Sequence, residues 1–364
     1  MIWKSVWRRV GMHFLGMTFL PVCLAGVAGA QAGGALFGPA GVTPQAVRQG
    51  SLGSCYFHAS IAALAKAAPD TLRGAISGDG KVGYRVHFFS GPDELVETED
   101  VEFARAQGFD HSDGLWVTVL MRAYAQRQLR GSMVRVIEQS ELLPIFAKPV
   151  VLAALAQTGP LVLAYDRAIR SVISQGGTGS LDKTAFKKQL TKQLSAAGIP
   201  SMQAQWLLGF LDQAGFYDTL AQTVQANGEI FGAYRGFGQG GIPVSVLEAF
   251  VGKASQGEVS EGNAPAIEAV LIRLHREGLA MVAGTRAALP LAAADSAGPS
   301  SKSTPDWWVG MHAYTVMDYN QGTGAVTLRN PWGGKPAPDG AFTLPLVSFL
   351  QAYKSYAFPG PAEP

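Results

Sequence analysis

The pattern of apolar and polar positions predicts helices in the first part of the chain and β-hairpins in the last third. Apolar side chains at helical spacing after Ser54 predict a helix that begins at Cys55 and ends near Pro69. Shorter apolar runs on either side of a Gly-Pro turn predict strands over residues 83–89 and 94–103. Helices early and strands late indicate an α+β fold with a cleft between two lobes.

The centre of the chain is predicted to be mostly helical. A helix is expected over 115–129, and residues from about 130 to 230 carry further helical spacing, with Ser201 as an expected N-cap. This block contains no recognisable chemical motif. It is interpreted as a helical insertion with three open roles: a lid or gate over the cleft, a docking surface for a partner, or a scaffold insertion without a role in activity.

The last third of the chain changes to β-structure. A helix capped by Asn263 and stopped by Gly278 precedes a buried strand over 279–283. Two strands at 313–319 and 325–329 then flank a five-residue turn with two glycines, which predicts a β-hairpin.

The net charge and the amino-terminal segment indicate which partners and which cellular location to expect. The 364 residues carry a formal net charge of +2 with no basic run, which argues against a nucleic-acid partner. Lys4, Arg8 and Arg9 precede an apolar stretch over 10–30 that ends in two overlapping A-x-A sites. This order is typical of a signal peptide over residues 1–32, so we expect export to the periplasm or the extracellular space. The alternative is a retained membrane anchor; once the signal is cleaved, no stable membrane span is expected.

Cysteine usage then points to one thiol. The chain has two Cys residues, and Cys23 lies in the expected leader, so Cys55 cannot form an internal disulfide in the mature chain. In the first turn of a helix, free N–H groups and the positive end of the dipole favour an anion, which is expected to lower the pKa of this thiol. A thiolate is the nucleophile that acyl transfer needs. A buried, inert Cys55 is the alternative.

The predicted hairpin supplies partners for this thiol. His312 opens its first strand and Asn330 closes its second, and residue 321 lies midway between them, so the register predicts that they lie side by side. An amide oxygen would hold the imidazole in one tautomer and orientation. Gln49, in the loop before Cys55, is a candidate oxyanion donor together with the backbone N–H of Cys55.

One other residue competes for the role of base. His58 lies three positions after Cys55 on the same helix face, but nothing near it in sequence would orient its ring. No C-x-x-C, H-E-x-x-H or EF-hand pattern indicates a metal site.

Three segments resemble the catalytic blocks of the calpain-type cysteine proteases, in the same order along the chain. They are Gln49-Gly50-Ser51-Leu52-Gly53-Ser54-Cys55-Tyr56-Phe57, His312-Ala313-Tyr314-Thr315-Val316 and Leu328-Arg329-Asn330-Pro331-Trp332-Gly333. The chain departs from the family at Ser54, Tyr56 and Met311, where Asp, Trp and Gly are usual.

The resemblance implies a papain-like two-lobed core in which Cys55 is nucleophile, His312 general base and acid, Asn330 orienter and Gln49 oxyanion donor. Together with the signal peptide (1–32) and the helical insertion (130–230) expected above, this gives an N-terminal catalytic lobe (33–129) and a C-terminal β-rich catalytic lobe (231–364). The expected function is an exported cysteine endopeptidase acting on protein or peptide substrates. The alternatives are a non-catalytic calpain-like binding module and an acyltransferase on the same scaffold. No cofactor is expected; calcium stays open because no calcium site can be identified.

Overall fold

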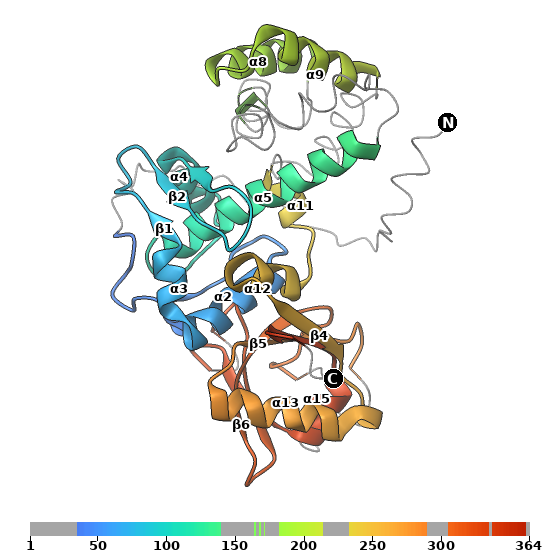
Figure 1. The fold of residues 1–364 in the computed structure, drawn as a ribbon. Coiled ribbons are helices and arrows are strands. Elements are labelled where there is room, and N and C mark those ends of the chain that lie inside the picture. The colour runs from blue at the N-terminus through green and yellow to red at the C-terminus, as the bar shows by residue number, and fades with distance from the viewer. Residues whose placement is uncertain are drawn as a thin grey trace.

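The computed structural model describes residues 35–139, 164, 167, 168, 171, 182–213, 233–289, 305–334 and 337–361. The expected signal peptide and much of the expected insertion lie outside these residues. The described elements form an α+β fold (Figure 1). In chain order they are η1 Pro44–Ala46, α2 Cys55–Ala67, α3 Pro69–Gly74, β1 Ile76–Ser77, β2 Tyr84–Val86, β3 Glu94–Val96, α4 Thr98–Ala106, α5 Trp116–Gln139, α8 Lys183–Ala196, α9 Ser201–Gln213, α11 Ala233–Phe237, α12 Pro243–Val251, β4 Ala254–Glu258, η2 Glu261–Asn263, α13 Ala264–Glu277, β5 Met281–Thr285, β6 Ala313–Asn320, β7 Ala325–Arg329, β8 Ala341–Pro345, α15 Leu346–Ala352 and β9 Tyr353–Pro359.

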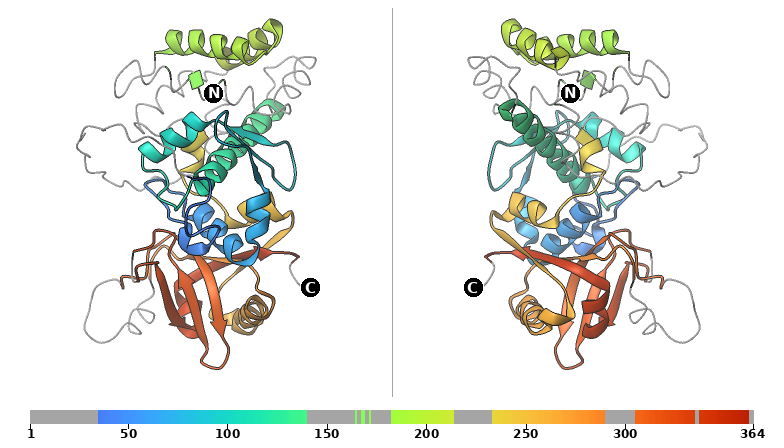
Figure 2. Two further views of the ribbon diagram at one scale, coloured as in Figure 1. Left: turned by 90° about the vertical axis from the view of Figure 1, so that its left-hand side faces the viewer. Right: turned by 90° about the vertical axis from the view of Figure 1, so that its right-hand side faces the viewer.

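A six-stranded antiparallel sheet, in the order β4-β9-β5-β6-β7-β8, separates two hydrophobic cores. Successive side chains of a strand point to opposite faces. On β5, Val282 accordingly packs into the core shared with α2 and α12, while Met281 and Ala283 pack into the core formed with α13 and α15. Figure 2 shows the same arrangement, with α2 on one side of the sheet and α13 on the other.

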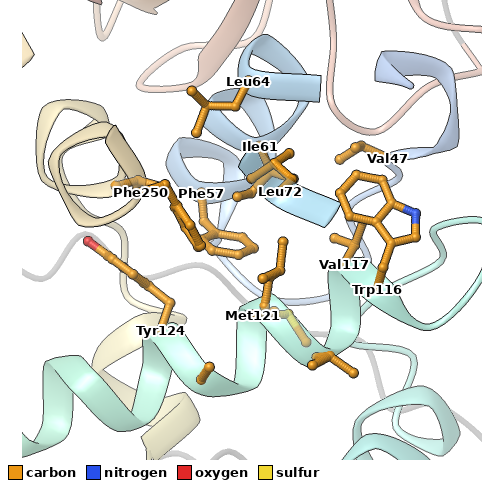
Figure 3. Close-up of a cluster of buried hydrophobic side chains, with 14 of the residues drawn as sticks. Val47, Phe57, Ile61, Leu64, Leu72, Trp116, Val117, Met121, Tyr124 and Phe250 are labelled. Atoms are coloured by element: carbon orange, nitrogen blue, oxygen red, sulfur yellow. The ribbon is translucent and has the colours of Figure 1, made fainter. Parts of the chain in front are cut away.

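The first core also fills the space between α2, α5 and α12. Met121 and Tyr124 project from α5 toward Phe57 and Ile61 of α2, and Trp116 of α5 lies next to Val47 (Figure 3). The three-stranded sheet β1-β2-β3 is antiparallel and packs against α5. The helix that carries Cys55 is therefore held on several sides by apolar contacts.

The structure corrects one predicted element. The strand expected over 94–103 ends at Val96, and α4 begins at Thr98. Glu99 and Asp100 lie in the first turn of this helix, where the positive end of the helix dipole stabilises carboxylates. Its buried residues include Val101 and Ala104, which are three positions apart as one helix face requires.

Other predicted elements are confirmed with shifted ends. The helix expected over 115–129 corresponds to α5, which begins one residue later and is longer. The helix between Asn263 and Gly278 is α13, whose C-cap glycine has a left-handed φ of 64°. The strand expected over 279–283 is β5, at Met281–Thr285. In the expected insertion, α8 and α9 are helices, and Ser201 is the first residue of α9 rather than its cap.

The helices α8 and α9 lie on one side of α5, and the six-stranded sheet lies on the other (Figures 1 and 2). Within the described ranges, no helix has the length and apolar character needed to cross a membrane.

Candidate active site

The loop that leads into α2 is held by close backbone contacts. A Cβ at Gly50 would lie 2.1 Å from the Gly108 oxygen, and one at Gly53 would lie 2.4 Å from the Gly238 oxygen. Only glycine permits such approaches. The loop from Arg48 to Leu52 is therefore packed against two other segments before the chain enters the helix.

Cys55 is the first residue of α2 and is half-buried, with no disulfide partner. The backbone N–H groups of Ala313, Tyr56 and Cys55 itself favour the thiolate form of its side chain. Burial raises the pKa of the thiol above its ordinary value, and the three N–H groups only partly oppose this effect. The lowered pKa expected from the helix position is therefore wrong for this state of the site, because desolvation outweighs the contribution of the helix terminus.

The hairpin of β6 and β7 has a different register from the predicted one. Asn320 pairs with Ala325 at the turn, and a bulge follows, so that Thr315 pairs with Arg329. A register centred on residue 321 would have set His312 directly opposite Asn330. Both residues instead lie just beyond the ends of their strands, where the side chains still meet.

His312 and Asn330 form a hydrogen bond, with 3.0 Å between Nε2 and Oδ1. The same Oδ1 accepts the backbone N–H of Trp332 at 3.1 Å. Because a backbone N–H can only donate, the amide atom facing it is the oxygen, and that oxygen in turn requires the proton of His312 to be on Nε2. The nitrogen left with a free lone pair is therefore Nδ1.

The ring of His312 is almost completely covered. It is 5% exposed, and the Trp332 ring lies 4.5 Å from it between centroids. Burial lowers the pKa of His312 to about 4, and the hydrogen bond that its Nε2 donates to Asn330 opposes this shift. The imidazole is thus neutral near pH 7, as a general base must be.

Three hydrogen bonds connect the nucleophile segment to the hairpin. The Gln49 N–H donates to the Pro331 oxygen at 2.9 Å, and the buried Arg329 guanidinium donates to the Val47 oxygen at 2.7 Å. The third joins β6 to α2: the Thr315 hydroxyl donates to the Ala59 oxygen at 2.8 Å. The chain thereby brings together residues separated by 256 and 282 positions in sequence.

The Gln49 side chain is 6% exposed and folds back toward the start of α2. Its Nε2 donates to the Leu52 oxygen at 2.6 Å, an oxygen that also accepts the backbone N–H of Ser54 at 2.8 Å. An amide nitrogen carries two hydrogens, so one donor remains beyond this bond.

His58 does not share the site of His312. It is fully buried; its Nδ1 lies 3.1 Å from the Ser54 hydroxyl and its Nε2 lies 3.4 Å from Asp110. The expectation that nothing near it in sequence orients this ring is wrong, because Ser54, four residues before it, contacts Nδ1; Asp110, 52 residues away, faces Nε2. Asp110 and Arg329 were not predicted as buried residues; Arg329 is a charged residue at the end of an apolar run, but Asp110 lies in a polar segment that gives no such signal.

Among the described residues, no group of three or more His, Cys, Asp or Glu side chains is arranged to hold a metal ion.

Comparisons with known proteins add little to this geometry. No protein-family model and no curated protein matches the chain. Among solved structures, the chain is similar to the crystal structure of PepW from Lactobacillus rhamnosis HN001 (DR20), determined as the selenomethionine derivative. The two share 11% sequence identity, the match covers 90% of this chain and 82% of that one, and the TM-score is 0.30. Such a low score supports no argument about fold or activity.

Proposed function

We propose that this chain is an exported, calpain-like cysteine endopeptidase with a papain-like two-lobed core. The observation that carries the proposal is the convergence of three distant segments on one point. The backbone N–H of Ala313, the residue directly after His312, favours the thiolate form of Cys55, and His312 is bonded to Asn330. A packed, inert cysteine would need neither the buried His312 imidazole nor the Asn330 amide that fixes the tautomer of that imidazole.

In the first step, Nδ1 of His312 takes the proton of the Cys55 thiol as the sulfur attacks the carbonyl carbon of a peptide bond. Both groups are neutral at rest, since burial raises the pKa of the thiol and lowers that of the imidazole. Proton transfer therefore accompanies attack. The imidazolium that forms is stabilised by its Nε2–H bond to Asn330.

The negative oxygen of the tetrahedral intermediate needs donors. The backbone N–H of Cys55, at the open end of α2, and the second hydrogen of Gln49 Nε2 are suited to this role. His312 then gives its proton to the leaving amine as the C–N bond breaks, which leaves a thioester on Cys55. Water, deprotonated by the same nitrogen, hydrolyses this acyl-enzyme and restores the thiol.

The alternative is a non-catalytic calpain-like binding module. Ser54 and Tyr56 stand where the family has Asp and Trp, and both are fully occupied by structural contacts. Ser54 lies beside His58, and the Tyr56 hydroxyl donates to the Phe237 oxygen at 3.3 Å. Neither substitution removes Cys55, His312 or Asn330, so the enzyme is the better supported function.

The proposal is tested by sequencing new N-termini after incubating the full chain with a pool of unfolded proteins, with calcium and with a chelator. Wild type is expected to produce specific new N-termini and Cys55→Ser none, while Cys23→Ser, the matched control at the other cysteine, behaves as wild type. An absence of new N-termini with wild type, in both conditions, would favour the binding module.

A further inference from the structure

Asp110 is a buried carboxylate that the proposed mechanism does not use. It is 1% exposed and lies in the loop between α4 and α5. Its two oxygens accept the hydroxyl groups of Ser112 and Thr118, each at 2.5 Å, and it faces the Arg105 guanidinium at 3.5 Å. Burial by itself would raise the pKa of Asp110, but hydrogen bonds from His58, Ser112 and Thr118 hold it below the ordinary value. The group is therefore a carboxylate with all its neighbours donating to it.

One arm of this network reaches the Gln49 loop. Gln49 and Asp110 pair as an isolated antiparallel bridge. On one side of that bridge, the His111 N–H donates to the Arg48 oxygen at 2.9 Å, and the Ser112 hydroxyl accepts the Arg48 N–H at 2.8 Å. Since Asp110 fixes the Ser112 hydroxyl, it also fixes the backbone directly before Gln49.

The other arm reaches the start of α2. An ionised Asp110 can only accept, so the Nε2 of His58, 3.4 Å away, donates to it. The Nδ1 of His58 lies 3.1 Å from both the hydroxyl and the backbone oxygen of Ser54. Ser54 immediately precedes Cys55, whose backbone N–H is one of the two proposed oxyanion donors.

We propose that Asp110 is a positioning residue that holds the Gln49 loop and the first turn of α2 in one arrangement, so that both oxyanion donors face the same point. The inference rests on the proposed function, because it concerns the geometry of that site. A displacement of about 1 Å between two such donors is enough to lose much of their effect on the transition state.

Asp110 and His58 do not themselves act on substrate. They are 1% and 0% exposed, and Nδ1 of His58 is occupied by Ser54. Cys55, His58 and Asp110 therefore do not form a second catalytic triad.

The test uses Asp110→Asn in the full chain. The amide keeps the volume of the carboxylate, but its nitrogen cannot accept a hydrogen bond from a hydroxyl. The hydrogen bond to either Ser112 or Thr118 is therefore lost. Asp113→Asn is the matched control, because Asp113 lies in the same loop and accepts the Ala40 N–H at an exposed site.

Three quantities are measured: kcat and KM for a fluorogenic peptide, the affinity for a peptide aldehyde, and the rate at which iodoacetamide alkylates Cys55. The aldehyde adds to the thiol to form a hemithioacetal, whose oxygen needs the two donors, whereas alkylation does not.

Asp110→Asn is expected to lower kcat and aldehyde affinity by about 10- to 100-fold, with KM and the alkylation rate within threefold of wild type. In a Gln49→Ala background, the same substitution should cost less than it does in the wild-type background, because one of the two donors that it misplaces is already absent. Ser112→Ala, which breaks only the arm to Arg48, should act in the same direction and serves if Asp110→Asn does not fold.

Two results overturn the inference and are distinguishable from failure of the proposed function. An active wild type with unchanged kcat and aldehyde affinity in Asp110→Asn and Ser112→Ala removes the positioning role alone. An equal loss with and without Gln49 does the same, since it marks a general structural effect. A wild type that neither cleaves peptides nor binds the aldehyde removes the proposed function and the positioning role with it.

Discussion

At His312, two neighbouring groups act on the ring in opposite directions. Burial beneath Trp332 removes water from the imidazole and disfavours its charged form, whereas the Asn330 oxygen favours it. Burial dominates, and the pKa falls from 6.5 to about 4. The free energy of folding then depends on pH through this residue.

The unfolded chain takes up a proton on His312 near pH 6.5, but the folded chain does so only near pH 4. Falling pH therefore favours the unfolded chain, and stability that is present above pH 6.5 is lost between these values. At pH 4.5 the loss from this residue is expected to be about 2.5 kcal/mol. Urea unfolding at pH 7.5 and 4.5 measures it, with His312→Gln as the reference whose decline should be smaller by that amount. Equal declines in both proteins would mean that burial does not shift this pKa.

Met311 has the only positive φ, 52°, among non-glycine residues in the described part of the chain. Its side chain is 74% exposed, so little packing offsets the left-handed backbone. Met311→Gly is therefore expected to be more stable than Met311→Ala by about 1 kcal/mol, since only glycine adopts this conformation without cost. Thermal unfolding of the two variants decides, and an equal melting temperature would show that the position carries no strain.

At the scale of elements, the connection between α2 and the six-stranded sheet determines the site. Helix positions with clear periodicity and glycine stops, such as Gly278, could be predicted from sequence. The register of β6 and β7 could not, because the turn itself pairs Asn320 with Ala325, and a bulge between Val316 and Asp318 then shifts the pairing by one residue. His312 and Asn330 could nevertheless be predicted to meet, since side chains at the open end of a hairpin tolerate such a shift. The role of Asp110 depends on long-range packing and could not be predicted.

The Thr315 hydroxyl provides a test of the connection between α2 and β6. It is fully buried and donates to the Ala59 oxygen at 2.8 Å. Thr315→Val keeps the shape and removes the donor, so the free energy of unfolding should fall by about 1 kcal/mol. Thr327→Val is the matched control, because Thr327 shares only an exposed 3.2 Å contact with Thr343, and its cost should stay below about 0.5 kcal/mol. If both substitutions cost the same, the buried bond does not stabilise the connection.

At the scale of the whole molecule, the described part of the expected insertion lies away from the candidate site. The views in Figures 1 and 2 place α8 and α9 beyond α5, while α2 lies next to the six-stranded sheet. The two helices are joined by an ion pair between Lys187 and Asp212 at 2.6 Å. This position favours docking or scaffolding over gating for these two helices.

Replacing residues 180–214 with a short Gly/Ser linker tests that assignment. We expect kcat for a short peptide to stay within about twofold of wild type, because access to Cys55 does not pass these helices. Stopped-flow or steady-state fluorescence on the purified variant measures it. A several-fold faster turnover in a well-folded variant would instead identify α8 and α9 as part of a gate.

The central claim is that Cys55 and His312 act as one catalytic unit, and kcat/KM for a peptide across pH 5 to 10 tests it most directly. Wild type should be active from near neutral pH, and Cys55→Ser should be reduced by at least about 1,000-fold at every pH. His312→Ala should be similarly reduced at pH 7 but recover as pH rises and the thiol ionises without a base. Equal activity of wild type and Cys55→Ser, or a His312→Ala variant as active as wild type at pH 7, would contradict the account.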